Sequence, residues 1–348
     1  MSAVASKEAP RDLLRISELT RGQLAHLLDL AMRMKAEPLA FREAEAGKAL
    51  ACYFAKPSTR TRVSLEGAAW RLGMLPIMPR PDELQLGRGE PIPDTASVLS
   101  GYVDAIAVRT FAQREVEELA AAASVPVINA LTDEHHPCQA LADLLTLRER
   151  FGESGRLRQT YLGEGNNVAR LRGLRLAYVG DGNNVANSLI EAGALLGMEV
   201  AVATPPDYHP DEAIVAAARE VAERAGGSVS VFTDPAEAVA GANAVYTDVW
   251  VSMGDEEEQR ERLAHLRPYQ VNEALMANAD RGAVFMQCLP AHRGEEVTEP
   301  VIDGPRSVVF EQAANRLPTE QALIHTLVSD DWAHLVAMAG DGVGGAEQ

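Results

Sequence analysis

Hydrophobic residues along this chain fall into short runs that alternate with segments of helical periodicity. In the first half, the short runs predict buried strands at 50–55, 75–78, 105–108 and 125–129. The helical patterns lie at 14–35, 58–72, 95–102 and 139–150, and Gly73 can cap the second of them. This alternation predicts a parallel sheet with helical crossovers.

The second half repeats the alternation after a charged, glycine-rich stretch at 151–172. Strands are expected at 176–180, 199–203, 229–232, 244–247, 284–288 and 308–310. Helices are expected at 187–196 and from 319 to about 338. A length of 348 residues suits two domains. We therefore expect an α/β protein with domains at 1–150 and 151–318, each a mostly parallel sheet flanked by helices.

One segment of the linker nearly duplicates a segment of the second domain. Residues 161–169 read YLGEGNNVA, and residues 178–186 read YVGDGNNVA. The second copy follows an apolar run and opens a helical pattern, whereas the first copy has neither neighbour. We expect the second copy to be the working one and the first to be an insertion.

The overall charge and the cysteine content exclude several classes of protein. The formal net charge is −18, whereas nucleic acids and anionic membranes attract basic surfaces. The three cysteines are widely spaced and form no Cys-x-x-Cys pattern, so neither a disulfide framework nor a structural zinc site is expected. No apolar run is long enough to span a bilayer, and the N-terminus has no signal core. We expect a cytoplasmic protein that binds neither nucleic acid nor membrane.

The segment Ser58–Arg62, with the sequence STRTR, follows a predicted strand and opens a predicted helix. The exposed N–H groups of a first helical turn and the helix dipole favour an anion. The hydroxyl groups and the planar guanidinium of Arg60 add donors suited to phosphate. The alternative is an ordinary capped helix with surface arginines, but the strand–turn–helix context favours a phosphate site.

Further polar residues follow the third and fourth predicted strands, at the edge where parallel sheets bind ligands. Arg109 ends the third strand, and His136 and Gln139 come after the fourth. His136 can donate a hydrogen bond to a carbonyl oxygen, and Gln139 can hold an attached amide. A solvent-facing arginine and a structural histidine at a helix cap are the alternatives.

The turn Gly180–Asn184, with the sequence GDGNN, partly matches a dinucleotide-binding motif. That motif needs a third glycine where Val185 stands, and an acidic residue at the end of the next strand, which is absent. A nicotinamide-dependent oxidoreductase is therefore disfavoured. The two asparagines suit a small polar ligand at a helix start.

Two residues near the ends of predicted strands in the second half each have two possible roles. Asp248 can pair with the ammonium group of a ligand, or it can cap a helix. Cys288 lies at the C-terminal end of a predicted strand, where it is either a site residue or an inert buried thiol.

Taken together, these segments resemble the aspartate/ornithine carbamoyltransferase family. The resemblance covers residues from about 12 to 337, with the matching segments in the family's order. They are Ser58–Arg62, Gln85–Glu90, Val108–Thr110, His136–Gln139, Asp181–Asn184, Asp248 with Ser252–Gly254, Cys288–Pro290 and Asn315–Arg316. Within the family, the Ser-Met-Gly segment and Cys288 favour ornithine over aspartate as the acceptor.

The resemblance implies an enzyme that transfers the carbamoyl group of carbamoyl phosphate to the δ-amine of L-ornithine, giving L-citrulline and phosphate in arginine metabolism. It implies an active site in a cleft between two domains, with the final helix joining the first domain. No metal or cofactor is expected. A homotrimer is also implied, in which Gln85 reaches the site of a neighbouring subunit.

The family's motifs assign a role to each matching residue. Carbamoyl phosphate would be bound by Ser58, Thr59, Arg60, Thr61, Gln85, Arg109, His136, Gln139, Cys288, Leu289 and Arg316. Ornithine would be bound by Asn184, Asp248, Ser252 and Met253. Catalysis would depend on Arg60, Arg109, His136, Asp248 and Cys288.

The chain departs from the family pattern beside Cys288. Gln287 stands where the family usually has a histidine, and a glutamine side chain cannot be protonated. The near-duplicate at 161–169 is a second departure. The alternatives are therefore transfer to another amine, such as putrescine or an acylated ornithine, and a non-catalytic member of the family.

Overall fold

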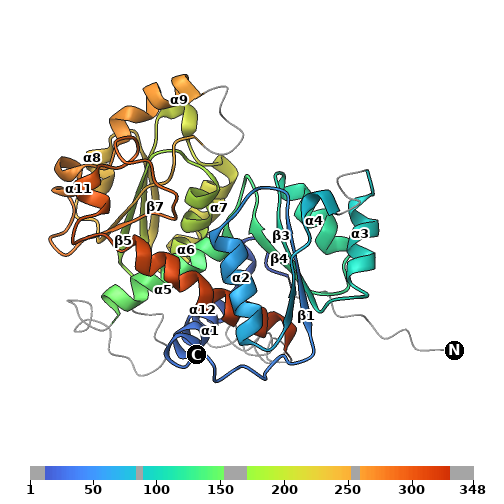
Figure 1. The fold of residues 1–348 in the computed structure, drawn as a ribbon. Helices are drawn as coiled ribbons and strands as arrows, with labels where there is room; N and C mark the ends of the chain where they lie inside the picture. The colour runs from blue at the N-terminus through green and yellow to red at the C-terminus, as the bar shows by residue number, and fades with distance from the viewer. Residues whose placement is uncertain (1–11, 84–88, 153–170, 252–258, 330–348) are drawn as a thin grey trace, which may run out of the picture.

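The computed structural model describes residues 12–83, 89–152, 171–251 and 259–329. Two parallel sheets lie side by side in it, with helices packed around each (Figure 1). The near-duplicate segment 161–169 and the part of the predicted final helix beyond 329 lie outside the described residues.

The first sheet has the strand order β2-β1-β3-β4, and all of its pairs are parallel. Its strands are β1 (Ala49–Phe54), β2 (Leu75–Ile77), β3 (Ala105–Arg109) and β4 (Val127–Leu131). The helices of this half are α1 (Arg21–Ala36), α2 (Arg60–Arg71), α3 (Ile92–Leu99), α4 (Gln113–Ala122) and α5 (Pro137–Phe151). Each connection between consecutive strands therefore contains a helix, as parallel strands require.

The second sheet has the order β7-β6-β5-β8-β9, again with parallel pairs. Its strands are β5 (Arg175–Val179), β6 (Glu199–Ala203), β7 (Ser228–Phe232), β8 (Ala244–Tyr246) and β9 (Val284–Met286). Its helices are α6 (Asn184–Leu196), α7 (Glu212–Ala225), α8 (Pro235–Val239), α9 (Gln259–Leu266), α10 (Glu273–Met276) and α11 (Glu299–Ile302). The strand order reverses between β5 and β8, which is where ligands bind in open α/β sheets.

The central strands are apolar throughout because helices cover both faces of each sheet. In β3, residues 105–108 are all buried, and in β5 residues 176–179 are buried. Two buried tyrosines, Tyr178 and Tyr246, stack with ring centroids 5.8 Å apart on neighbouring strands. The alternating pattern of the sequence therefore predicted the buried strands well.

The prediction of a strand at 308–310 is wrong. Ser307 makes one isolated bridge to Phe285, and the chain then enters α12 (Val309–Val328). The apolar residues of this segment are the first turn of an amphipathic helix, and three apolar residues cannot distinguish a strand from such a turn. Arg316 consequently lies within the last described helix, not before it.

Other differences concern the ends of helices and the helices for which no residue range was predicted, which are α4 in the first half and α7 to α11 in the second. The pattern at 14–35 divides into a short 3-10 turn (Ile16–Glu18) and α1, whose start is fixed by a capping box of Thr20 and Gln23. Helix α4 was missed, although Val116, Leu119 and Ala120 give it a buried face at helical spacing.

Helix α12 joins the two halves of the molecule. Figure 1 shows it running from the second sheet across to the first, where it packs against α1, α2 and α5. Its buried residues include Leu323, Ile324 and Leu327 of the main core cluster. The two walls between which ligands can bind therefore share one continuous helix.

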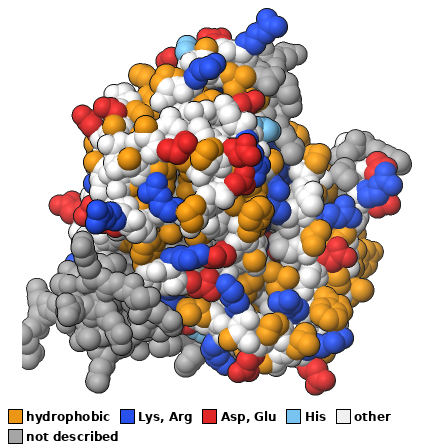
Figure 2. All heavy atoms as spheres, turned by 60° about the vertical axis from the view of Figure 1, so that its left-hand side comes forward, with side chains coloured by type: hydrophobic (Ala, Val, Ile, Leu, Met, Phe, Trp, Pro, Cys, Tyr) orange, Lys and Arg blue, Asp and Glu red, His pale blue; other side chains and the backbone are white. Residues whose placement is uncertain are grey.

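No helix among the described residues is long and apolar enough to cross a bilayer. On the face drawn in Figure 2, Lys and Arg side chains are scattered among Asp and Glu side chains instead of forming one basic stripe.

Candidate active site

A cleft of about 880 Å³ opens between the carboxyl ends of the two sheets. All of the predicted site residues that the structure describes line it: Ser58, Thr59, Arg60, Thr61, Arg109, His136, Gln139, Asn184, Asp248, Cys288, Leu289 and Arg316. The other three, Gln85, Ser252 and Met253, lie outside the described residues. The sequence therefore identified side chains that folding brings together from both halves of the chain.

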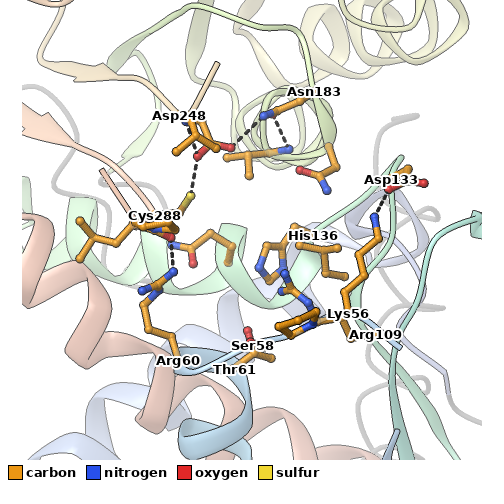
Figure 3. Close-up of a pocket in the computed structure, with 18 of the residues that line it drawn as sticks. Lys56, Ser58, Arg60, Thr61, Arg109, Asp133, His136, Asn183, Asp248 and Cys288 are labelled. Carbon is orange, nitrogen blue, oxygen red and sulfur yellow. Dashed lines mark hydrogen bonds and ion pairs between the residues drawn. The ribbon is translucent and has the colours of Figure 1, made fainter. Parts of the chain in front are cut away.

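The two walls of the cleft differ in charge. Figure 3 shows Arg60 and Thr61 at the start of α2 on one side, and Asp248 with Asn183 on the opposite side. The first wall presents guanidinium groups and a helix N-terminus, and the second presents a carboxylate. A ligand that fills the cleft would meet an anion-binding end and a cation-binding end.

Helix α2 begins directly at the cleft. Its N-cap residue, Thr59, makes no side-chain capping hydrogen bond in the described structure, and the Thr61 hydroxyl accepts a hydrogen bond from Arg316 Nη2 at 3.0 Å. The N–H groups of the first turn are therefore left for another acceptor. An anion at this position would satisfy them and would also meet the positive end of the helix dipole.

Three arginines, Arg60, Arg109 and Arg316, line the same end of the cleft. Burial lowers the pKa of Arg109 to about 10, with a further contribution from the Arg316 charge, and burial also lowers the pKa of Arg60. Only Arg316 has a direct carboxylate partner in the described residues, Glu320 at 2.6 Å. This excess of buried positive charge favours a bound anion.

Arg60 and Arg109 differ in their contacts. Arg60 Nη2 donates to the backbone oxygen of Leu289 at 2.6 Å, across the cleft. Arg109 Nε is buried and has no hydrogen-bond partner among the described residues. Arg109 therefore has an unsatisfied donor at the end of β3 that a ligand oxygen can fill.

His136 is buried at the start of α5 and is neutral. Burial lowers its pKa well below the usual value, and the charges of Arg316, Arg109 and Arg60 lower it further. Its backbone N–H donates to Ser188 Oγ at 2.8 Å, which fixes the residue against α6 of the other half. A neutral imidazole among arginines can donate a hydrogen bond to an oxygen without adding another charge.

The opposite wall is organised around Asp248, just past β8. Its carboxylate accepts hydrogen bonds from Cys288 Sγ at 3.0 Å, Asn183 Nδ2 at 2.8 Å and the Val249 N–H at 2.8 Å. Burial raises the pKa of Asp248, and these hydrogen bonds partly oppose that rise. The carboxylate is thus held in place with few counter-charges, as a site for a ligand ammonium requires.

Cys288 is a thiol in this arrangement, not a thiolate. Burial raises its pKa well above the usual value, and the neighbouring Asp248 carboxylate raises it further. Because the thiolate is the nucleophilic form of cysteine, Cys288 is poorly suited to attack a substrate. Its position suits hydrogen bonding instead, with Asp248 as the acceptor.

The two asparagines of the β5–α6 turn have different contacts. Asn184 Nδ2 donates to the Thr132 backbone oxygen at 2.5 Å, and so connects the two halves at the cleft. Asn183 caps α6 through its side-chain oxygen and donates to Asp248. Sequence reasoning chose Asn184 alone, because the cap and the Asp248 contact depend on the folded turn.

The structure also places Lys56 in the cleft, which the sequence analysis did not assign to the site. Its ammonium group pairs with Asp133 and lies 4.3 Å from the ring centre of Phe111. The one sequence feature that could have indicated Lys56 was its position between a predicted strand and the Ser-Thr-Arg segment. Asp181 and Arg262 form another ion pair that lines the opposite wall.

Gln287, the departure from the family pattern, does not line the cleft. It is fully buried, and its Nε2 donates to Glu296 Oε1 at 2.8 Å and to the Pro290 oxygen at 3.3 Å. The His292 N–H donates to the same Glu296 oxygen at 2.6 Å. Gln287 therefore holds the loop that follows Cys288, and this side chain, which cannot titrate, lies outside the cleft.

Among the described residues, one group of side chains has metal-ligand spacing: His292, Glu295 and Glu296. His292 Nδ1 lies 3.8 Å from Glu295 Oε2 and 3.9 Å from Glu296 Oε2. These separations place one ring nitrogen of His292 near two carboxylate oxygens.

The Asp248–Cys288 contact predicts slow alkylation of the thiol. In native protein at pH 8, iodoacetamide should label Cys288 more slowly than free cysteine, and should spare the fully buried Cys52 and Cys138. Asp248→Asn removes the negative charge and should accelerate labelling, about tenfold for each unit by which the thiol pKa falls. Mass spectrometry of tryptic peptides locates the label. Equal rates in both proteins would contradict the contact.

Comparison with known proteins assigns the two halves of the chain to two family models. Residues 11–149 match the carbamoyl-P binding domain of aspartate/ornithine carbamoyltransferase, and residues 172–327 match the Asp/Orn binding domain. Two proteins named ornithine carbamoyltransferase are similar along most of their length. That of Symbiobacterium thermophilum is 50% identical, covering 92% of this chain and 98% of its own. That of Anoxybacillus flavithermus is 49% identical, covering 91% and 96%.

Solved structures give the same result. Ornithine carbamoyltransferase from Pyrococcus furiosus superposes with a TM-score of 0.83 at 46% identity, covering 93% of this chain and 98% of that one. The enzyme from Gloeobacter violaceus gives 0.79 at 45% identity, covering 92% and 99%. Cleft, fold and sequence agree, and the chain belongs to the aspartate/ornithine carbamoyltransferase family.

Proposed function

We propose that this protein transfers the carbamoyl group of carbamoyl phosphate to the δ-amine of L-ornithine, giving L-citrulline and phosphate. The observation that carries the proposal is the polarity of the cleft, with arginines and a helix N-terminus on one wall and Asp248 on the other. The relatives named ornithine carbamoyltransferase support it. So does the match of both halves to the corresponding binding domains.

The phosphate group is assigned to the start of α2. Ser58, Thr59 and Thr61 supply hydroxyl groups. The N–H groups of the first turn supply further donors at the positive end of the helix dipole. Arg60 adds a charged donor from the same turn. Phosphate is the leaving group, so an environment that stabilises its developing charge lowers the barrier to its departure.

The carbamoyl group is assigned to the space between Arg109, His136 and Gln139. Attack on its carbon produces a tetrahedral oxyanion, and Arg109 and neutral His136 can both donate to that oxygen. Donors placed for an oxyanion are commonly worth about 2.7–4 kcal/mol each in the transition state. Leu289, Cys288 and Arg316 complete this part of the cleft.

Ornithine is assigned to the wall that carries Asn184 and Asp248, together with Ser252 and Met253 of the neighbouring segment. An amine of this type has a pKa of about 10.4 and must lose a proton before it attacks. Asp248 can attract the ammonium and, with Cys288, position the nitrogen. The N–C bond then forms, the C–O bond to phosphate breaks, and the proton that the nitrogen releases passes to the departing phosphate.

The acceptor is tested by an amine panel. Purified protein is incubated with carbamoyl phosphate and with ornithine, an N-acylated ornithine, putrescine or aspartate, and the carbamoylated product is measured. We expect product with ornithine in clear excess over the other amines. Preference for putrescine or acylated ornithine would replace the proposed acceptor, and absence of product with every amine would favour a non-catalytic member of the family.

Arg109→Ala should reduce kcat/KM at least about 100-fold, since it removes a charged donor from the oxyanion. Arg60→Ala should have an effect at least as large. The matched control is Arg114→Ala, which removes an exposed guanidinium whose partner in the described part of the chain is Glu118, and should leave the rate unchanged. Near-normal citrulline formation by the Arg109 variant would contradict the proposed role.

We further propose a cytoplasmic homotrimer in which Gln85 of one subunit reaches the site of the next. The described surface carries an apolar edge patch, defined here as Val63 and Trp70 of α2 with Leu75 and Ile77 of the edge strand β2, all exposed in the single chain. Natural proteins rarely leave such an edge uncovered. The unpaired cysteines agree with a reducing compartment.

Leu75→Glu should weaken the assembly, because it places a charge in the edge patch, where Leu75 is 62% exposed. Light scattering after gel filtration should find about three times the 37.4 kDa chain mass for the native protein and a lower mass for the variant. Leu39→Glu changes another exposed leucine and serves as the control. A native protein that elutes as a monomer would exclude the trimer.

A further inference from the structure

A buried carboxyl group lies just behind the cleft and has no role in the proposed reaction. Asp143 is on α5, one turn beyond Gln139, and is completely inaccessible to solvent. It does not line the cleft. An acidic side chain at such a position is rare unless its hydrogen bonds serve the structure around it.

Asp143 uses one oxygen to hold two glutamine side chains. Its Oδ1 accepts from Gln139 Nε2 at 2.7 Å and from Gln312 Nε2 at 2.6 Å. The Tyr246 hydroxyl also forms a hydrogen bond with this carboxyl group, whereas the buried Oδ2 has no partner of its own among the described residues. Both glutamines are themselves buried, so neither can exchange this contact for bulk water.

These contacts decide which way each glutamine amide faces. With Nε2 committed to Asp143, the oxygen of Gln139 faces Arg316, whose Nη1 donates to it at 2.8 Å. The reversed amide would set an oxygen against a carboxylate and an NH₂ group against a guanidinium, which removes both hydrogen bonds. Asp143 therefore fixes the orientation of a side chain that lines the cleft.

Through the amide of Gln312, Asp143 also constrains a segment of the other wall. The oxygen of Gln312 accepts the N–H of Gln287 at 3.0 Å, directly before Cys288. Gln312 Nε2 also contacts the hydroxyl of Tyr246 on β8 at 3.1 Å. Through the two glutamines, one carboxyl oxygen is connected to α5, α12 and the ends of β8 and β9.

We propose that Asp143 is a positioning residue for carbamoyl-phosphate binding, acting as a hydrogen-bond acceptor through Gln139. This inference rests on the proposed function. Its acceptor role does not need a negative charge, because a proton on the unpartnered Oδ2 would leave Oδ1 as a carbonyl oxygen. Burial raises the pKa of Asp143 to about 7, which agrees with a group that works in either state.

Two substitutions at Asp143 separate the acceptor from the charge. Asp143→Asn keeps an oxygen for both glutamines and should stay within about threefold of the native KM for carbamoyl phosphate. Asp143→Leu keeps the volume but removes the acceptor, and should raise that KM about tenfold or more, with a smaller effect on the KM for ornithine. The control for general destabilisation is Thr146→Val on the same helix, which removes a hydrogen bond donated to Ala142 and one accepted from Asn315 of α12. It should leave both KM values unchanged.

A double-mutant cycle tests the route through Gln139. In a Gln139→Ala background, Asp143→Leu should no longer change the KM for carbamoyl phosphate, because the side chain it positions is gone. Thermal melting of every variant identifies those that fail to fold, and the Asn variant remains informative if the Leu variant unfolds. The native protein must first make citrulline; failure at that step contradicts the proposed function, not the role of Asp143.

Three results would overturn the inference. Equal losses in the Asn and Leu variants would show that the charge matters and not the acceptor. An unchanged KM in a folded Asp143→Leu protein would remove the positioning role. Additive effects of Asp143→Leu and Gln139→Ala would show that Asp143 acts by another route.

Discussion

The structure depends on a concentration of positive charge at the carboxyl end of the first sheet. Arg60, Arg109 and Arg316 converge there, and among the described residues only Glu320 pairs directly with one of them. A protein with a net charge of −18 thus keeps a local excess of the opposite sign inside a cleft. Low-dielectric walls make such a cluster costly when empty and effective when an anion neutralises it. Burial keeps His136 neutral, and the charges of the same three arginines add to that effect.

Most of the fold could be predicted from the sequence because both sheets are parallel and buried. Their strands are short apolar runs separated by helical periods, which is the pattern that parallel strands with helical crossovers require. Prediction failed at 308–310, where the chain makes one bridge to Phe285 before it turns into a helix. It also gave no range for α4 or for α7 to α11, three of which are only four or five residues long. Local patterns specify elements better than they specify where one element changes into another.

Many residues of the site could be predicted from the sequence, but several of their contacts could not. The strand-end residues Arg109, His136 and Asp248 were recognisable because the carboxyl edge of a parallel sheet collects ligand contacts. The Asn183 contact with Asp248, the place of Lys56, and the burial of Gln287 away from the cleft were not recognisable. These depend on side-chain directions set by turns and by packing between distant segments, which no spacing rule contains.

The hydrogen bond from Arg60 to the Leu289 backbone oxygen physically connects the two walls of the cleft. A guanidinium group has several donors in one plane, so Arg60 can keep this bond while another N–H turns to an anion. The same side chain then belongs to both walls at once. Any loss of Arg60 changes the geometry of the acceptor wall as well as the charge of the phosphate wall, so its two contributions are not separable by deleting it. A lysine, as a compact point charge, would retain the charge and lose the bridge.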